Sequence, residues 1–203
     1  MLKVYENYPI LIKAINFINI SNTLSNNLPY HGIDHLFSVF EMMHNIIENN
    51  PSYVIDDKKE LYLASLFHDY SHSGGELKDS ENIINALDGL ILFHKANPDF
   101  NLEITISLIK ATEFPYVISE NELSFYQKLM RDADLCYLFS DLSIVKLYNG
   151  LRNEFKSGYN TFLINQFNFL NSVKFYNDYY NKLWETEIKE IRLKELELLK
   201  KYV

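Results

Sequence analysis

The chain has 203 residues, of which 47% are hydrophobic, and it carries a formal net charge of −8. This length and composition predict a single folded domain over residues 1–203 and exclude a disordered chain. The acidic balance argues against polymeric nucleic acid as a partner, since proteins hold nucleic-acid phosphates with Lys and Arg. A single cysteine, Cys136, excludes an internal disulfide, and without a secretory signal or an apolar run of about 18 residues the sequence predicts a soluble, cytoplasmic protein with no membrane partner.

Apolar residues recur at helical spacing between the prolines and glycines, and no strand-type alternation of convincing length is present. The sequence therefore predicts an all-α, multi-helix bundle. The expected helices are, in chain order, residues 10–20, 34–50, 57–72, 79–97, 104–112, 120–134, 142–155, 161–180 and 183–202. The last of these is amphipathic, and we expect it to pack on its own domain, with a homodimer contact as the alternative.

Three separated segments carry the residues that we expect to bind metal. The apolar run 61–67 leads into His68 and Asp69, while His35 lies upstream and Asp134 lies downstream after another helical pattern. An imidazole and a carboxylate buried side by side cost several kcal/mol unless a partner or a metal compensates. A lone buried histidine is more often a hydrogen-bonded core residue, but the combination of three such motifs favours a metal site.

The spacing of the histidines adds a geometric expectation. His31 and His35 are four residues apart, as are His68 and His72, so on a helix each pair shares one face. Two imidazoles and two carboxylates suit Zn, Fe or Mn, and if Asp69 bridges, a second ion held mostly through water suits Mg or Mn. Two such ions lower the pKa of a bridging water and clamp a phosphoryl group.

The motifs Y-H-x-x-x-H, A-x-x-x-H-D-x-x-H-x-G and A-D-L, in this order, resemble those of the HD-domain metal-dependent phosphohydrolases, and among these the class I cyclic-nucleotide phosphodiesterase catalytic domains. The resemblance covers about residues 29–184. It implies an HD-domain fold with two divalent ions, and the family's metal ligands fall on His35, His68, Asp69 and Asp134. It also implies that His31 donates a proton to the leaving oxygen and that His72 lies by the second ion and its waters.

The same resemblance extends to the substrate pocket. Residues 109–113 are similar to the family's L-A-T-D segment on the pocket wall, and residues 166–169 resemble the Q-x-x-F that holds a purine. An amide can pair with a base edge, and stacking of an aromatic ring on a base is worth about 1–3 kcal/mol. The alternative from spacing alone is that Phe169 belongs to the core and that Gln166 is a surface amide. The expected substrate contacts are Tyr30, Thr112, Gln166 and Phe169.

The chain departs from the family pattern at several positions. Gly32 stands where an Asn usually follows the first His, Ser73 replaces the Pro of the H-P-G turn, and Glu113 replaces the Asp of L-A-T-D. Small HD hydrolases with Asn-Glu at a similar place suggest that Glu81 orients the waters of the metal site. The chain is also shorter than the animal enzymes' catalytic domain, which predicts a wider pocket.

Together these observations predict a metal-dependent phosphodiesterase that hydrolyses a cyclic nucleotide or cyclic oligonucleotide by attack of a metal-activated hydroxide on phosphorus. One alternative is a nucleotide phosphomonohydrolase or pyrophosphohydrolase that uses the same site, because a fold does not determine the substrate. Another is a metal- or ligand-binding helical module without turnover. In both enzymatic cases the expected partner is a small nucleotide substrate.

Overall fold

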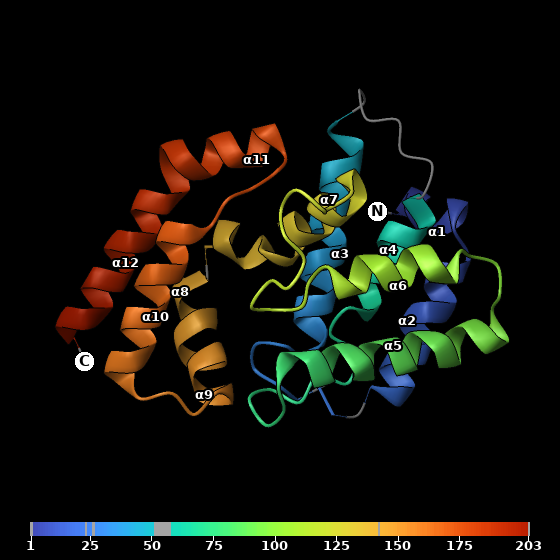
Figure 1. The fold of residues 1–203 in the computed structure, drawn as a ribbon, viewed down its shortest axis with the longest axis horizontal. Coiled ribbons are helices and arrows are strands. Elements are labelled where there is room, and N and C mark those ends of the chain that lie inside the picture. Colours follow the sequence, from blue (N-terminus) through green and yellow to red (C-terminus); the bar gives the residue numbers. More distant parts are fainter. Residues whose placement is uncertain (1, 23, 26, 51–57, 142, 203) are drawn as a thin grey trace.

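The computed structural model of the chain describes residues 2–22, 24–25, 27–50, 58–141 and 143–202. Every regular element within these ranges is a helix, so the predicted all-α bundle is confirmed (Figure 1). No helix in the described ranges is long and apolar enough to cross a membrane. The elements are α1 (Leu2–Asn7), α2 (Ile10–Ser21), α3 (Ile33–Glu48), α4 (Lys58–Phe67), α5 (Asp79–Ala96), α6 (Leu102–Lys110), α7 (Phe125–Asp134), the short 3-10 helix η1 (Cys136–Phe139), α8 (Ser143–Val145), the π-helix η2 (Lys146–Leu151), α9 (Arg152–Glu154), α10 (Tyr159–Ser172), α11 (Asp178–Leu183), the π-helix η3 (Trp184–Ile188) and α12 (Lys189–Tyr202).

Two apolar clusters organise the bundle. The larger lies among α1 to α7, where α4 is buried on all sides and packs against α3 and α6. A helix that is apolar all round has to be enclosed by other elements, so α4 forms the centre of this cluster. The smaller cluster joins η1 to the helices from α8 onward around the fully buried Trp184. In Figure 1, its orange-to-red helices α10 to α12 stand beside the blue-to-green helices of the larger cluster.

Two helix boundaries near the histidines differ from the prediction. α4 ends at Phe67 instead of reaching His72, and the turn that follows passes through Ser71, whose φ of 55° cannot continue a right-handed helix. α3 begins at Ile33, after His31. Each four-residue histidine pair therefore straddles a helix end, and the expectation that His68 and His72 lie on one face of a helix over 57–72 is wrong.

The helix predicted over 161–180 is two helices, α10 and α11. The buried carboxylate of Asp132 accepts hydrogen bonds from the backbone N–H groups of Tyr176 and Asn177 at 2.7–3.1 Å. Those N–H groups are consequently not available to an uninterrupted helix. The side chain of Asn177 then caps the first turn of α11.

The other predicted helices correspond to α2, α3, α5, α6, α7 and the run from α8 to α9. The last predicted helix begins earlier than expected, because α11, η3 and α12 follow one another without a break from Asp178 onward. α1 was not predicted. The predicted helix starts at Asp57 and Leu142 lie outside the described residues.

Candidate metal centre

The ends of α3, α4 and α7 meet at one point. His35 lies in the first turn of α3, His68 and Asp69 directly follow α4, and Asp134 is the last residue of α7. One ligand atom from each of the four residues lies within 4.8 Å of all the others, and both imidazoles are almost completely buried. The structure thus brings together the four side chains that the sequence pointed to as metal ligands.

The distances between these atoms are those expected around a shared ion. His35 Nε2 lies 3.1 Å from Asp134 Oδ1 and 3.2 Å from His68 Nε2. Asp69 Oδ2 lies 3.3 Å from the Nε2 of His35 and 3.4 Å from that of His68. Atoms about 2.1 Å from one ion, at angles of about 90–110°, lie about 3.0–3.4 Å from one another. The four residues can therefore hold a metal ion.

Hydrogen bonding orients His68 for this role. Its Nδ1 lies 2.9 Å from the carbonyl oxygen of Ser65, which can only accept, so Nδ1 donates a proton there and Nε2 is the nitrogen that faces the cluster. A contact of this kind fixes the tautomer and the direction of a metal-ligating imidazole. His35 differs, because its buried Nδ1 has no hydrogen-bond partner among the described residues, and the orientation of its ring depends on what Nε2 contacts.

Without an ion, the four groups compensate their burial by pairing charges. Burial opposes protonation of His68, but the carboxylates of Asp69 and Asp134 outweigh it and raise the pKa of the imidazole to about 10. Burial also opposes ionisation of Asp134, but the two imidazoles lower the pKa of its carboxyl to about 2. A divalent cation can take the place of the protons that such a cluster holds.

A buried carboxylate that the sequence reasoning missed holds His31. The Oε2 of Glu154 lies 2.5 Å from His31 Nδ1, and its Oε1 accepts the backbone N–H groups of Tyr30 and His31 at 2.5 and 3.0 Å. Burial lowers the pKa of His31, and the hydrogen bond to Glu154 acts in the opposite direction. No motif marks Glu154, which is 123 residues from His31 along the chain. The burial of its carboxylate is what reveals it.

His72 lies beside His31 rather than among the four ligands. The two imidazole rings stack with their centroids 3.8 Å apart. The Nδ1 of His72 accepts the backbone N–H of Gly74, and its Nε2 lies 3.0 Å from Asn82 Nδ2 and 3.7 Å from Asp79 Oδ1. His72 therefore supports the ring of His31 and connects it to α5.

Three of the four candidate ligands, His35, Asp69 and Asp134, line a cleft of about 770 Å³, to which residues of both apolar clusters also contribute. The four expected substrate contacts, Tyr30, Thr112, Gln166 and Phe169, all line it. Gln166 is only 7% exposed, so its interpretation as a surface amide is wrong. Its Oε1 is buried and has no hydrogen-bond partner among the described residues, which is unusual for a buried polar atom.

The carboxylate that faces the cleft from α5 belongs to Asp79 and not to the predicted Glu81. Glu81 is exposed, and its Oε2 accepts the backbone N–H of Lys78 as part of the helix cap. Asp79 lines the cleft, and its Oδ2 accepts the backbone N–H of Phe114 at 2.5 Å. A glutamate three residues after an N-cap commonly turns back to the cap, which explains why Glu81 is occupied elsewhere.

The cleft thus combines a cluster that can hold a metal ion, a histidine held by a carboxylate, and an amide with an unpartnered acceptor. Comparison of the chain with protein-family models, with curated proteins and with solved structures finds no match. Function therefore has to be inferred from the chemistry of the site, since a helical bundle by itself does not determine it.

Proposed function

We propose that the protein is a metal-dependent phosphodiesterase of the HD-domain type that hydrolyses a cyclic nucleotide or cyclic oligonucleotide. The observation that carries the proposal is the convergence of His35, His68, Asp69 and Asp134 at the mutual distances of ligands around one ion, at a cleft large enough for a nucleotide. Zn, Fe or Mn suits this donor set, and Mg or Mn suits a second ion held through Asp69 and water. A divalent ion there lowers the pKa of water and stabilises negative charge on phosphoryl oxygens.

His31 is the proposed proton donor to the leaving oxygen. It lines the cleft beside the ligands, with its ring centroid 6.0 Å from that of His35. Glu154 fixes the direction of the ring, and although burial lowers the pKa of His31 overall, the hydrogen bond to Glu154 acts against that shift and favours the protonated imidazole that a donor needs. Donating a proton to the departing oxygen avoids expelling an alkoxide, which lowers the barrier to cleavage.

The charge of the cleft favours a phosphodiester over the alternative substrates. Among the described residues that line it, Lys78 is the one lysine or arginine, and Asp69, Asp79 and Asp134 contribute carboxylates. A phosphate monoester carries about −1.5 to −2 charges at pH 7, whereas a diester has a single ionisable oxygen. Beyond the proposed ions, Lys78 is then the one described cation of the lining to balance further phosphate charge, which suits the diester better than the monoesters or pyrophosphates of the competing hydrolases.

Gln166 and Phe169 are the proposed base site. They lie three residues apart on α10, so both side chains project from one side of that helix into the cleft. A rotation of the Gln166 amide that turns its buried, unpartnered Oε1 toward the cleft lets this oxygen accept a hydrogen bond from an amino group on the edge of a base, and the ring of Phe169 offers a stacking surface.

The proposal is tested by incubating the Mn-loaded protein with a panel of cyclic and linear nucleotides and separating the products by chromatography. We expect ring opening of a cyclic nucleotide and little release of inorganic phosphate from monoesters. His31→Ala should lower kcat by about 10²- to 10⁴-fold with unchanged bound metal, whereas His94→Ala, outside the cleft, should leave kcat unchanged.

Other outcomes of this experiment contradict the proposal. Cleavage confined to monoesters or pyrophosphates would favour the competing hydrolases. Bound metal with no turnover of any nucleotide would favour a binding module, and wild-type turnover by His31→Ala would remove His31 from the mechanism.

A further inference from the structure

Large apolar side chains surround the mouth of the cleft and are half exposed. They are Leu77, Phe114, Tyr116 and Phe155, with exposed fractions between 41% and 52%. They come from three segments: Leu77 precedes α5, Phe114 and Tyr116 lie between α6 and α7, and Phe155 follows α9. An apolar rim around a cleft of this kind is typical of a surface that a ligand covers.

One wall of the cleft carries an aromatic surface next to the proposed base site. Phe114 contacts Phe169 and Tyr116, with ring centroids 6.0 and 5.4 Å apart and nearly perpendicular planes. Phe169 lies on α10 one turn beyond Gln166. A base held at Gln166 would therefore be covered by this aromatic wall.

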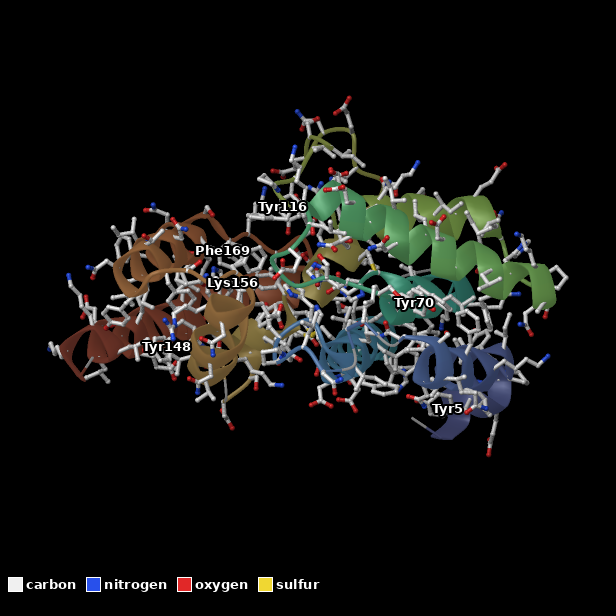
Figure 2. The ribbon with its side chains drawn as sticks, turned by 90° about the horizontal axis from the view of Figure 1, so that it is seen from below. Tyr5, Tyr70, Tyr116, Tyr148, Lys156 and Phe169 are labelled. Atoms are coloured by element: carbon white, nitrogen blue, oxygen red, sulfur yellow. The ribbon has the colours of Figure 1, made fainter. Side chains whose placement is uncertain are left out.

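Phe155 forms a second aromatic surface, beside the proton donor. Its ring centroid lies 6.2 Å from that of His31, and the neighbouring Glu154 holds the same histidine. After Phe155 the chain turns through Lys156, whose φ of 50° is unusual for a residue other than glycine. Figure 2 labels Lys156, the residue that follows Phe155, and Phe169 of the proposed base site.

We propose that the substrate is a cyclic dinucleotide, with one base at Gln166 and Phe169 and the second base stacked on Phe155. This inference rests on the proposed function and names its substrate class. A cyclic mononucleotide has one base, which Gln166 and Phe169 would hold, whereas Phe155 follows a different helix and makes no ring contact with Phe169 among the described residues. A second base covers the ring of Phe155, and stacking between a base and an aromatic ring is favourable for any base.

The charges of the cleft agree with two phosphodiesters. The reacting phosphate lies at the metal ligands, and Lys78, at the N-terminal end of α5, lines another part of the same cleft. The N-terminus of an 18-residue helix adds partial positive charge to that of the lysine. The carboxylate of Asp79 begins the same helix and also lines the cleft, so among the described lining residues Lys78 is the one side chain that can pair with the charge of a second diester. The volume of about 770 Å³ lies in the upper part of the range of about 300–1,000 Å³ for small-molecule sites.

The reaction opens the ring at one linkage. The oxygen of water forms a bond to phosphorus while the bond from phosphorus to one ribose oxygen breaks. The ribose oxygen takes the proton that His31 donates, and the proton lost by water returns to the imidazole through solvent. The product is a linear dinucleotide that carries one terminal phosphate, and no oxidant or further reactant is needed.

The inference is tested by measuring kcat/KM of the Mn-loaded protein for cyclic di-adenylate and for cyclic adenylate. We expect the wild-type protein to prefer the dinucleotide. Phe155→Ala should lower kcat/KM for the dinucleotide by about 5- to 150-fold and change that for the mononucleotide by less than about 2-fold. Phe155→Tyr, which keeps the ring, should retain the preference. Phe167→Ala is the matched control, because Phe167 is a half-exposed phenylalanine of α10 that does not line the cleft.

The outcomes separate this inference from the proposed function. Equal or better cleavage of the mononucleotide leaves the phosphodiesterase in place and overturns the dinucleotide. Equal losses on both substrates in Phe155→Ala also overturn it, because they indicate a disturbed Glu154 and His31 instead of a lost base contact. Cleavage of neither compound by the metal-loaded wild type contradicts the proposed function itself, and with it the inference.

Discussion

Glu154 shows how one buried side chain can set the properties of its neighbours. Its carboxylate accepts two backbone N–H groups and contacts the ring of His31, so a single residue fixes both the backbone and the side chain of the proposed proton donor. A buried carboxylate without such partners would cost several kcal/mol. The contacts therefore hold His31 in one position, and the charge of Glu154 favours its protonation.

Glu154→Gln keeps the shape of the side chain and removes its negative charge. We expect kcat to fall about 10- to 100-fold, the usual effect of losing a carboxylate that orients a reactive group, with little change in KM or bound metal. Steady-state kinetics and elemental analysis measure these quantities. Glu190→Gln is the control, because Glu190 pairs with Lys194 on the surface. Loss of metal at unchanged kcat would contradict this role for Glu154.

The sequence predicts His68 and Asp69 but not Glu154, and the difference has a physical reason. His68 and Asp69 end an apolar run, and that context identifies them because burial of such groups needs compensation. Glu154 sits in a polar segment, R-N-E-F, that is also typical of a solvated helix end. Its role arises from a contact between distant segments, which single-sequence periodicity does not encode.

At the scale of the elements, the turn that follows α4 positions much of the site. Residues 68–75 include two of the candidate metal ligands, His68 and Asp69. The same turn carries His72 and approaches α9 closely. The two glycines predicted a break in the helix, but the break comes earlier because Ser71 is held by contacts with other helices. Its N–H donates to the side chain of Asn22 at 2.8 Å, and its carbonyl accepts from Asn85 at 3.3 Å. Local propensity cannot predict such long-range contacts.

Gly75 has no room for a side chain, because an added Cβ would lie 2.7 Å from both the carbonyl oxygen of Glu154 and the Cα of Phe155. We expect Gly75→Ala to lower the free energy of unfolding by about 1–3 kcal/mol. It should also lower kcat, since the backbone that carries Glu154 has to move. Urea unfolding and kinetics measure both effects.

Gly158 provides the control for this substitution, since an added Cβ there meets nothing within 4 Å. Gly158→Ala should leave kcat unchanged. If Gly75→Ala kept wild-type stability and turnover, the turn that follows α4 would not be coupled to α9 through this close contact.

At the scale of the whole molecule, the two apolar clusters contribute different parts of the site. The ends of α3, α4 and α7 supply the metal ligands, and α9 and α10 supply the carboxylate that holds His31 and the proposed base site. Helical periodicity predicts most of these helices. How these helices pack around a common cleft depends on long-range contacts. Only the resemblance of the motifs to a known family predicted that the helices with the candidate ligands would meet the helix with the proposed base site.

Binding of a metal at the junction of three helices should stabilise the whole molecule. A divalent ion at about 100 times its Kd adds about 2.7 kcal/mol to the free energy of unfolding, which raises Tm by about 5–10 °C for a chain of this size. Calorimetry with Mn²⁺ and with a chelator measures the difference. His35→Ala should abolish it, and an equal Tm of the wild-type protein in both conditions would contradict metal binding.

The most direct test of the account is elemental analysis of the purified chain after loading with Mn²⁺ and desalting. The account predicts that the wild-type protein and His94→Ala retain the ion, and that His68→Ala and Asp134→Ala lose it. Retention of the same amount of metal by the folded His68→Ala and Asp134→Ala variants, or no metal in the wild-type protein, would contradict the claim that these side chains form a metal centre.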